Sequence, residues 1–177
     1  MGTIIRAFRE EDVPNKVRWI NDDRNNRFLH YDLPLNIEGT YRWFHKNQQL
    51  SDRYDAVIEY KGKPVGVIGL LTIKEGRAEY YITIGEQEYK GKGIAKEATR
   101  QLLEYAFTEL NLNEVYLYTE VNNTGAQKLF EKCGFRKVEL LKNSAVNRGV
   151  AVDRLYYVIT AEEFMEYNKL AENNWGG

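Results

Sequence analysis

The chain has 177 residues, of which 43% are hydrophobic and 29% charged, and this predicts one ordinary globular domain spanning residues 1–177. Its 25 basic and 26 acidic residues give a net charge of −1, a balance that argues against a general nucleic-acid or membrane-surface binder. The longest apolar run, residues 65–71, is much shorter than the roughly 20 residues of a membrane span, so we expect neither nucleic acid nor a membrane as partner.

The first fifty residues are predicted to hold one strand and two helices. Residues 3–8 have the character of a strand. A helix with one apolar face follows Asp12, and residues 38–47 form the second helix. The stretch between the helices, residues 21–36, is rich in Asp, Asn and Arg and is predicted to be irregular.

Strand patterns replace helical ones in the next part of the chain. Residues 54–60, 65–73 and 78–84 are each predicted to be a strand. Turn-forming residues at 61–64 and 74–77 separate them. The short connections predict an antiparallel meander of three strands.

The second half alternates helices and strands. A long helix is predicted over residues 94–110, a strand over 115–121 and a short helix over 124–132. A further strand begins at Phe135, and the last covers 154–159. The whole pattern predicts an α/β (α+β) fold, with a mixed central sheet of six to seven strands and helices on both faces.

A glycine-rich turn, residues 90–93, joins the third meander strand to the long helix. Backbone N–H groups at a helix start carry the positive end of its dipole, so this loop suits a phosphate or pyrophosphate. Two nucleotide motifs do not fit, because Lys96 stands where a dinucleotide fingerprint needs glycine, and Glu86 and Gly93 depart from a Walker A loop. The alternative is a plain turn between strand and helix.

Residues 88–95, EYKGKGIA, resemble the acetyl-CoA pyrophosphate loop of the GNAT N-acetyltransferases. Residues 121–126 and 129–135 resemble the second signature of the same family. Glu88 stands where the usual pattern has Gln or Arg, as often in the branch similar to ribosomal-protein N-terminal acetyltransferases. The element order agrees as well, so the resemblance covers nearly the whole chain and implies the GNAT fold.

The resemblance implies acetyl transfer from acetyl-CoA, as cosubstrate, to an amine. It implies that two adjacent strands splay apart and that the pantetheine arm lies between them, where an N–H group near Ile82 would polarise the thioester carbonyl. Asn123 matches a family asparagine at the start of the short helix, where it would also serve as an N-cap. The expected cofactor-binding residues are Ile82, Ile84, Tyr89, Lys90, Gly91, Lys92, Gly93, Ile94, Ala95 and Asn123.

Two residues are candidates for proton transfer. Glu79 lies within an apolar and aromatic strand, and related enzymes often carry a glutamate there as a general base acting through water; the alternative is a residue on the solvent face. Phe130 stands where many family members have the tyrosine that protonates the departing thiolate. We take Tyr118 as the candidate proton donor instead, while leaving open three other tyrosines, Tyr81, Tyr116 and Tyr157.

The acceptor amine is expected to contact the N-terminal helices and their connection. This part resembles acetyltransferases of amino-sugar nucleotides, whose phosphates and rings would suit arginine and aromatic side chains. A polyamine, a protein N-terminal amine and a solvated loop without ligand stay open as alternatives, as does an acyl-CoA-binding module without catalysis. The candidate substrate-binding residues are Arg24, Tyr31, Trp43 and Tyr81.

The remaining reactive side chains predict no further chemistry. Cys133 is the only cysteine and falls on an apolar helix face, which predicts a packed core thiol. His30 and His45 lack metal-ligand spacing, so we expect no metal. A single cysteine and the absence of an apolar leader predict a cytoplasmic protein. A homodimer is expected only because similar folds often dimerise.

Overall fold

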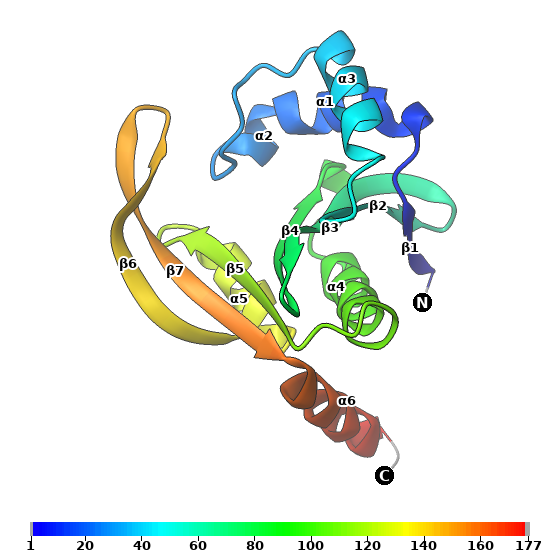
Figure 1. The fold of residues 1–177 in the computed structure, drawn as a ribbon, viewed down its shortest axis with the longest axis vertical. Helices are drawn as coiled ribbons and strands as arrows, with labels where there is room; N and C mark the ends of the chain where they lie inside the picture. Colours follow the sequence, from blue (N-terminus) through cyan, green and yellow to red (C-terminus); the bar gives the residue numbers. More distant parts are fainter. Residues whose placement is uncertain (1, 176–177) are drawn as a thin grey trace.

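A seven-stranded sheet organises the computed structural model, which describes residues 2–175 (Figure 1). The strands lie in the order β1-β2-β3-β4-β5-β7-β6, and every neighbouring pair is antiparallel except β4 and β5, which are parallel. The predicted mixed sheet is therefore confirmed. The strands are β1 (Thr3–Ala7), β2 (Tyr54–Tyr60), β3 (Lys63–Lys74), β4 (Arg77–Ile84), β5 (Glu114–Glu120), β6 (Arg136–Asn147) and β7 (Val150–Thr160).

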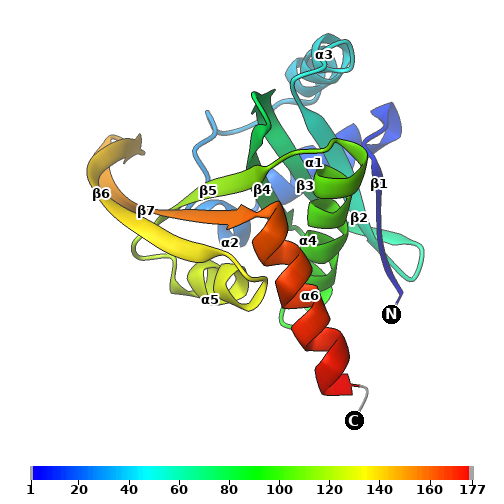
Figure 2. The same ribbon diagram turned by 60° about the horizontal axis from the view of Figure 1, so that its bottom comes forward.

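Helices cover both faces of this sheet, as predicted. One face of the N-terminal half carries the first three helices, and α4 and α5 lie on the opposite face (Figures 1 and 2). The α-helices are α1 (Val13–Asn21), α2 (Asp23–Asn26), α3 (Ile37–Asn47), α4 (Ile94–Glu104), α5 (Thr124–Lys132) and α6 (Ala161–Trp175). Within residues 2–175, none of the helices is long and apolar enough to span a membrane.

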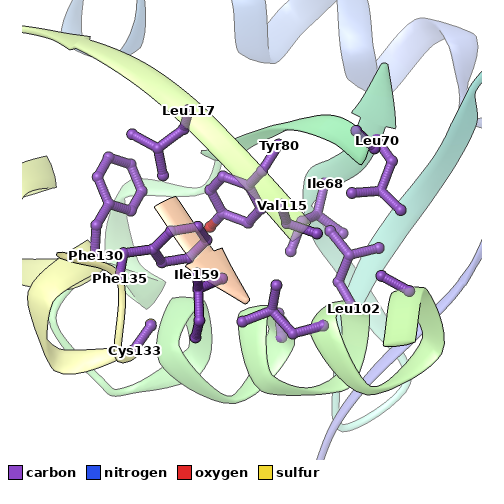
Figure 3. Packing of buried hydrophobic residues seen from close by; sticks show 14 of the residues in the cluster. Ile68, Leu70, Tyr80, Leu102, Val115, Leu117, Phe130, Cys133, Phe135 and Ile159 are labelled. Carbon is purple, nitrogen blue, oxygen red and sulfur yellow. The ribbon is translucent and has the colours of Figure 1, made fainter. Parts of the chain in front are cut away.

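Strand alternation divides the core between the two faces. On β2, Val57 faces α1 and α3, while its neighbours Ala56 and Ile58 face the α4 side. The larger cluster joins β3, β4, β5 and β7 to α4 and α5, with Leu102, Phe130 and other labelled residues at its centre (Figure 3). The smaller cluster fixes the helices that carry the predicted acceptor residues onto the sheet.

Two elements in the first two thirds of the chain differ from the sequence prediction. Residues 23–26, expected to be irregular, form α2, which begins where the Asp22 side chain accepts a hydrogen bond from the Arg24 N–H; a single turn is too short to show a period. The long helix does not continue regularly to residue 110, because a π-turn at Tyr105–Glu109 replaces its last part. The π-type bond runs from the Leu110 N–H to the Tyr105 carbonyl oxygen at 3.1 Å.

The sequence predicted too little regular structure in the C-terminal part of the chain. The last strand, expected over residues 154–159, begins at Val150 and forms a long hairpin with β6. Irregularities in β6, between Lys137 and Glu139 and again between Leu141 and Ala145, break the period-two pattern that would have revealed its length. The final helix, α6, was not predicted, and Phe164 is its one residue in the large core cluster.

Candidate active site

The parallel pair β4 and β5 forms a fork. The two strands pair only at Arg77↔Glu114, Ala78↔Val115 and Glu79↔Tyr116, and beyond that point they diverge (Figure 1). The fork therefore has a vertex at Glu79 and Tyr116, with the rest of β4 and of β5 as its two arms. A sheet that opens in this way offers unpaired backbone groups to an extended ligand.

Backbone N–H groups of the β4 arm face into the fork. The Gly85 N–H donates to the Val65 carbonyl oxygen at 2.8 Å, and the β3–β4 register continues in step from this pair. Antiparallel ladders alternate, so Tyr81 and Thr83 bond to β3, while the N–H groups of Ile82 and Ile84 point to the side of β5. These are the two residues that the sequence placed along the pantetheine arm.

The glycine-rich loop lies where the β4 arm ends and α4 begins. Gly91 and Gly93 have φ values of +76° and +79°, and a Cβ built on either would meet no atom within 4 Å in the described structure. The first bond of the helix runs from the Glu97 N–H to the Gly93 carbonyl at 3.2 Å, so the N–H groups of the first turn precede the helical ladder. This open, donor-lined cradle fits the diphosphate of a CoA thioester.

A polar residue, Asn25, and an aromatic one, Tyr89, hold the loop in place. Asn25 on α2 accepts hydrogen bonds from Lys90 Nζ at 2.5 Å and Gln87 Nε2 at 2.6 Å, and its amide donates to the Gly85 carbonyl at 3.0 Å. The Tyr89 ring lies beside two lysines, with Lys92 Nζ 5.4 Å from its centroid. Sequence reasoning missed Asn25, because nothing distinguishes it from the polar residues around it.

Glu79, the candidate base, is half-buried at the vertex of the fork. Burial raises the pKa of its carboxyl group, and the positive charge of Arg154 partly offsets that rise. By strand alternation its side chain lies on the face opposite α4, together with Tyr116. A carboxylate with a raised pKa beside the separating strands is a stronger base than an exposed one.

Tyr118, the candidate proton donor, lies on the β5 arm and is 38% exposed. Its ring stacks on Tyr156 with centroids 5.2 Å apart, and the Arg154 guanidinium lies 4.5 Å from its centroid. Two of the three alternative tyrosines already use their hydroxyls: that of Tyr81 donates to Asp55, and that of Tyr157 donates to Glu131. Burial raises the pKa values of both these tyrosines, which makes them weaker acids.

Phe130, the departure from the family tyrosine, is part of the core. It is 7% exposed and packs edge to face against Tyr80 at 5.6 Å (Figure 3). Cys133 lies close to it, and burial raises the pKa of its thiol to about 11, which agrees with a packed thiol rather than a nucleophile. Asn123 caps α5 by accepting from the Ala126 N–H at 3.3 Å.

Three of the four predicted substrate residues come together. Lys16 Nζ lies 3.2 Å from the centroid of Trp43 and 5.8 Å from that of Tyr31, and Tyr81 bonds to Asp55 in the same group. Arg53 completes the group through Asp55, at 2.7 Å. Sequence reasoning missed Lys16, Arg53 and Asp55, because no local pattern relates these positions.

Arg24, the fourth predicted substrate residue, is not part of this group. Its guanidinium pairs with Asp22 at 2.8 Å on α2, and its side chain is largely exposed. The Trp43 ring contacts two other cations: besides Lys16, the Arg53 guanidinium lies 5.3 Å from its centroid. Arg24 therefore pairs with a carboxylate, while the cation contacts of Trp43 are with Lys16 and Arg53.

A latch closes the wide end of the fork. Asn147, at the turn between β6 and β7, donates to the Arg27 carbonyl at 3.0 Å and to Glu120 at 2.6 Å. The next residue, Arg148, bonds to Asn26 Oδ1 at 2.6 Å. His30 completes the latch by bonding to Glu120 at 2.9 Å. The hairpin tip and the segment after α2 thereby bridge over the diverging strands.

With this geometry known, comparison with characterised proteins is informative. Residues 3–136 match the model of the acetyltransferase (GNAT) domain. The chain belongs to the GNAT acetyltransferase family. This confirms the resemblance that the loop and the second signature carried, and members of the family use acetyl-CoA, as the geometry of the loop and fork predicts.

Two curated relatives and one solved structure illustrate the kinship. The chain is 30% identical to the N-acetyltransferase p20 of Bacillus licheniformis over 116 residues, 64% of this chain and 65% of p20. It is 30% identical over 141 residues to the spermidine N(1)-acetyltransferase of Vibrio cholerae, 74% of this chain and 77% of that enzyme. A Vibrio cholerae spermidine N-acetyltransferase structure with CoA and spermine superposes with a TM-score of 0.86, at 23% identity, over 93% of this chain and 98% of the other, which confirms the GNAT fold.

The match to p20 spans just under two thirds of that relative's length. The family and fold are therefore properties of this chain, whereas its acceptor amine has to be argued from its own residues.

Proposed function

We propose that this protein transfers the acetyl group of acetyl-CoA to a primary amine of a small molecule, and that polyamines are the acceptor class to test first. The observation that supports transfer most strongly is the fork, with the open loop at the end of one arm and a half-buried carboxylate, Glu79, at its vertex. These features combine a diphosphate cradle, free backbone donors and a base in one place.

Different residues of the chain carry out the separate parts of the reaction. Acetyl-CoA, when bound, supplies an activated thioester. In this proposal the N–H of Ile82, which points to the side of β5, donates to the thioester carbonyl oxygen and stabilises negative charge there. Glu79 accepts, through water, the proton that the acceptor ammonium loses to become the attacking neutral amine, and the Tyr118 hydroxyl donates a proton to the leaving sulfur. The loop of Gly91 and Gly93 holds the diphosphate.

Polyamines are favoured over amino-sugar nucleotides by two observations. Relatives at 30–34% identity are named spermidine N(1)-acetyltransferases. In this chain, the Arg24 guanidinium is already paired with Asp22, so it would have to leave that carboxylate to bind a nucleotide phosphate. Carboxylates on the acceptor face, Glu79 and Glu120, suit a cationic acceptor.

A thiol-release assay with acetyl-CoA and a panel of amines tests this proposal. The panel contains spermidine, spermine, an amino-sugar nucleotide, an aminoglycoside, amino acids and short peptides. We expect turnover with the polyamines. Turnover confined to another class would overturn the acceptor assignment alone. No turnover with any amine, while acetyl-CoA still raises the melting temperature, would support a binding module instead.

A further inference from the structure

The strongest unexplained feature on the acceptor face is the carboxylate of Glu120. It lies at the far end of the β5 arm and is 8% exposed, although a buried carboxylate normally needs full compensation. The hydrogen bonds from Asn147 and His30 both reach the same oxygen, Oε2. Among residues 2–173, whose side chains the structure describes, no group donates a hydrogen bond to Oε1.

Oε1 is not sealed inside the protein. In the described part of the chain, every enclosed side-chain nitrogen or oxygen has a hydrogen-bond partner. An oxygen of Glu120 without a partner must therefore reach accessible space. The latch residues hold one oxygen, and the other is left for a ligand or water.

This free oxygen lies on the same side of the sheet as Glu79. Tyr116, Tyr118 and Glu120 are alternate residues of β5, so their side chains share one face, and Tyr116 is the cross-strand partner of Glu79 at the vertex. Glu120 lies four strand steps beyond Tyr116, which is about 13 Å at the rise of a β-strand. The acceptor face thus has one carboxylate at the vertex of the fork and another at the far end of the β5 arm, beneath the latch.

Building on the proposed function, we propose that Glu120 binds the distal ammonium group of a polyamine whose other end is acetylated beside Glu79. The separation suits an extended triamine better than a short diamine. Tyr118 lies between the two carboxylates along β5, with its ring stacked on Tyr156 and covered by the Arg154 guanidinium. The latch of His30 and Asn147 orients the Glu120 carboxylate without occupying its second oxygen.

One cation of the protein shares this space. Arg154 is the cross-strand partner of Glu120, but its guanidinium bonds to Ser144, at 3.0 Å to Oγ and 2.9 Å to the carbonyl oxygen. No carboxylate of the described residues lies within 4.0 Å of it. Arg154 therefore leaves both carboxylates free to pair with a ligand.

The test compares Glu120→Gln with the wild-type enzyme on spermidine and on butylamine, which has no distal ammonium. Glutamine keeps an oxygen for His30 and Asn147, so the latch can persist while the charge is lost. We expect the KM for spermidine to rise about tenfold or more, kcat to change less than about twofold, and the KM for butylamine to stay unchanged. Glu162→Gln, an exposed substitution on α6, is the matched charge control.

A binding measurement keeps the test independent of catalysis. Spermidine alone should raise the melting temperature of the wild type and of Glu162→Gln, but not that of Glu120→Gln. Equal losses on both amines, or a variant that melts early without ligand, would assign Glu120 a purely structural role and overturn the proposal. Unchanged kinetics on spermidine would also overturn it while leaving the proposed function intact. A wild type that acetylates no polyamine would overturn both.

Discussion

The indole of Trp19 lies directly against Gly85. A Cβ on Gly85 would stand 2.0 Å from Trp19 Cγ, so only glycine allows this contact. Trp19 is 1% exposed, and its Nε1 donates to Glu86 at 2.9 Å. The contact joins α1 to the end of β4, immediately before the loop that we assign to the diphosphate.

Gly85→Ala should therefore lower the free energy of unfolding by about 1–3 kcal/mol, because the added methyl group displaces the indole. It should also weaken acetyl-CoA binding, since the Glu86 anchor moves with Trp19. Urea unfolding and calorimetric titration measure the two effects. Gly125→Ala is the control, as a Cβ there meets nothing within 4 Å and alanine favours its helix. Equal stability of the two variants would contradict the close contact.

Gly91→Val should weaken acetyl-CoA binding by at least about a hundredfold, because the side chain fills the cradle and removes hydrogen bonds to a charged group. Gly62→Val is the matched control. Gly62 has a positive φ of +82° and open space around it, but it lies in the turn between β2 and β3. Both substitutions place a valine at a positive φ, so the two variants carry similar backbone strain. A difference in acetyl-CoA binding between them therefore reports on the loop. Retained binding in Gly91→Val would remove the loop from the site.

Local signals in the sequence predicted the elements that we assign to the cofactor. The helix Thr124–Lys132 was predicted with both its ends, because Asn123 caps it and Gly134, at φ +98°, ends it. The loop at Gly91 was visible because glycine spacing and a helix start coincide in a few residues. Such short-range patterns depend little on the rest of the fold.

Contacts between residues far apart in the sequence could not be predicted from such short-range patterns. Asn147 meets Arg27 across 120 positions and Glu120 meets His30 across 90, and neither pair has a sequence pattern. Lys16 is a similar case: a lysine in a polar-looking helix gave no sign that it would lie under Trp43. The acceptor side of the site is built almost entirely from such contacts, which is why its residues were the hardest to predict.

Glu79→Gln should lower kcat while leaving acetyl-CoA affinity similar, because the amide cannot accept the proton. In the wild type, kcat/KM should fall as the pH drops through the raised pKa of Glu79. Arg154→Gln removes a charge that lowers this pKa, so the fall should begin at a higher pH. Arg136→Gln, an exposed arginine paired with Glu163, controls for net charge. A pH profile that does not move in Arg154→Gln would exclude Glu79 as the titrating base.

Tyr118→Phe should lower kcat about tenfold or more with little change in KM, because the ring still stacks on Tyr156 while the proton donor is lost. Tyr156→Phe is the control, since its hydroxyl bonds to Arg77 at 2.6 Å rather than facing the fork. Steady-state kinetics with saturating acetyl-CoA separate the two variants. If kcat is unchanged in Tyr118→Phe, the thiolate leaves without a proton, as a thiol pKa of about 8.5 would allow.

The buried amine of Lys16 should lower the free energy of unfolding at neutral pH. Burial lowers the pKa of its amine to about 7, although Asp55 partly opposes the effect. In the unfolded chain a lysine titrates near pH ~10.4, so between about pH 7 and 10 the unfolded state binds more protons and the stability of the wild type rises with pH.

Lys16→Met keeps the length of the side chain without the charge, and should raise the free energy of unfolding near pH 7 by up to about 3 kcal/mol, less whatever the contact with Trp43 contributes. This advantage should narrow as the pH approaches 10, because the wild-type lysine becomes neutral in both states. Urea unfolding at several pH values measures it, with the exposed Lys46→Met as control. A constant difference between Lys16→Met and the wild type across that range would show that the buried amine does not titrate there.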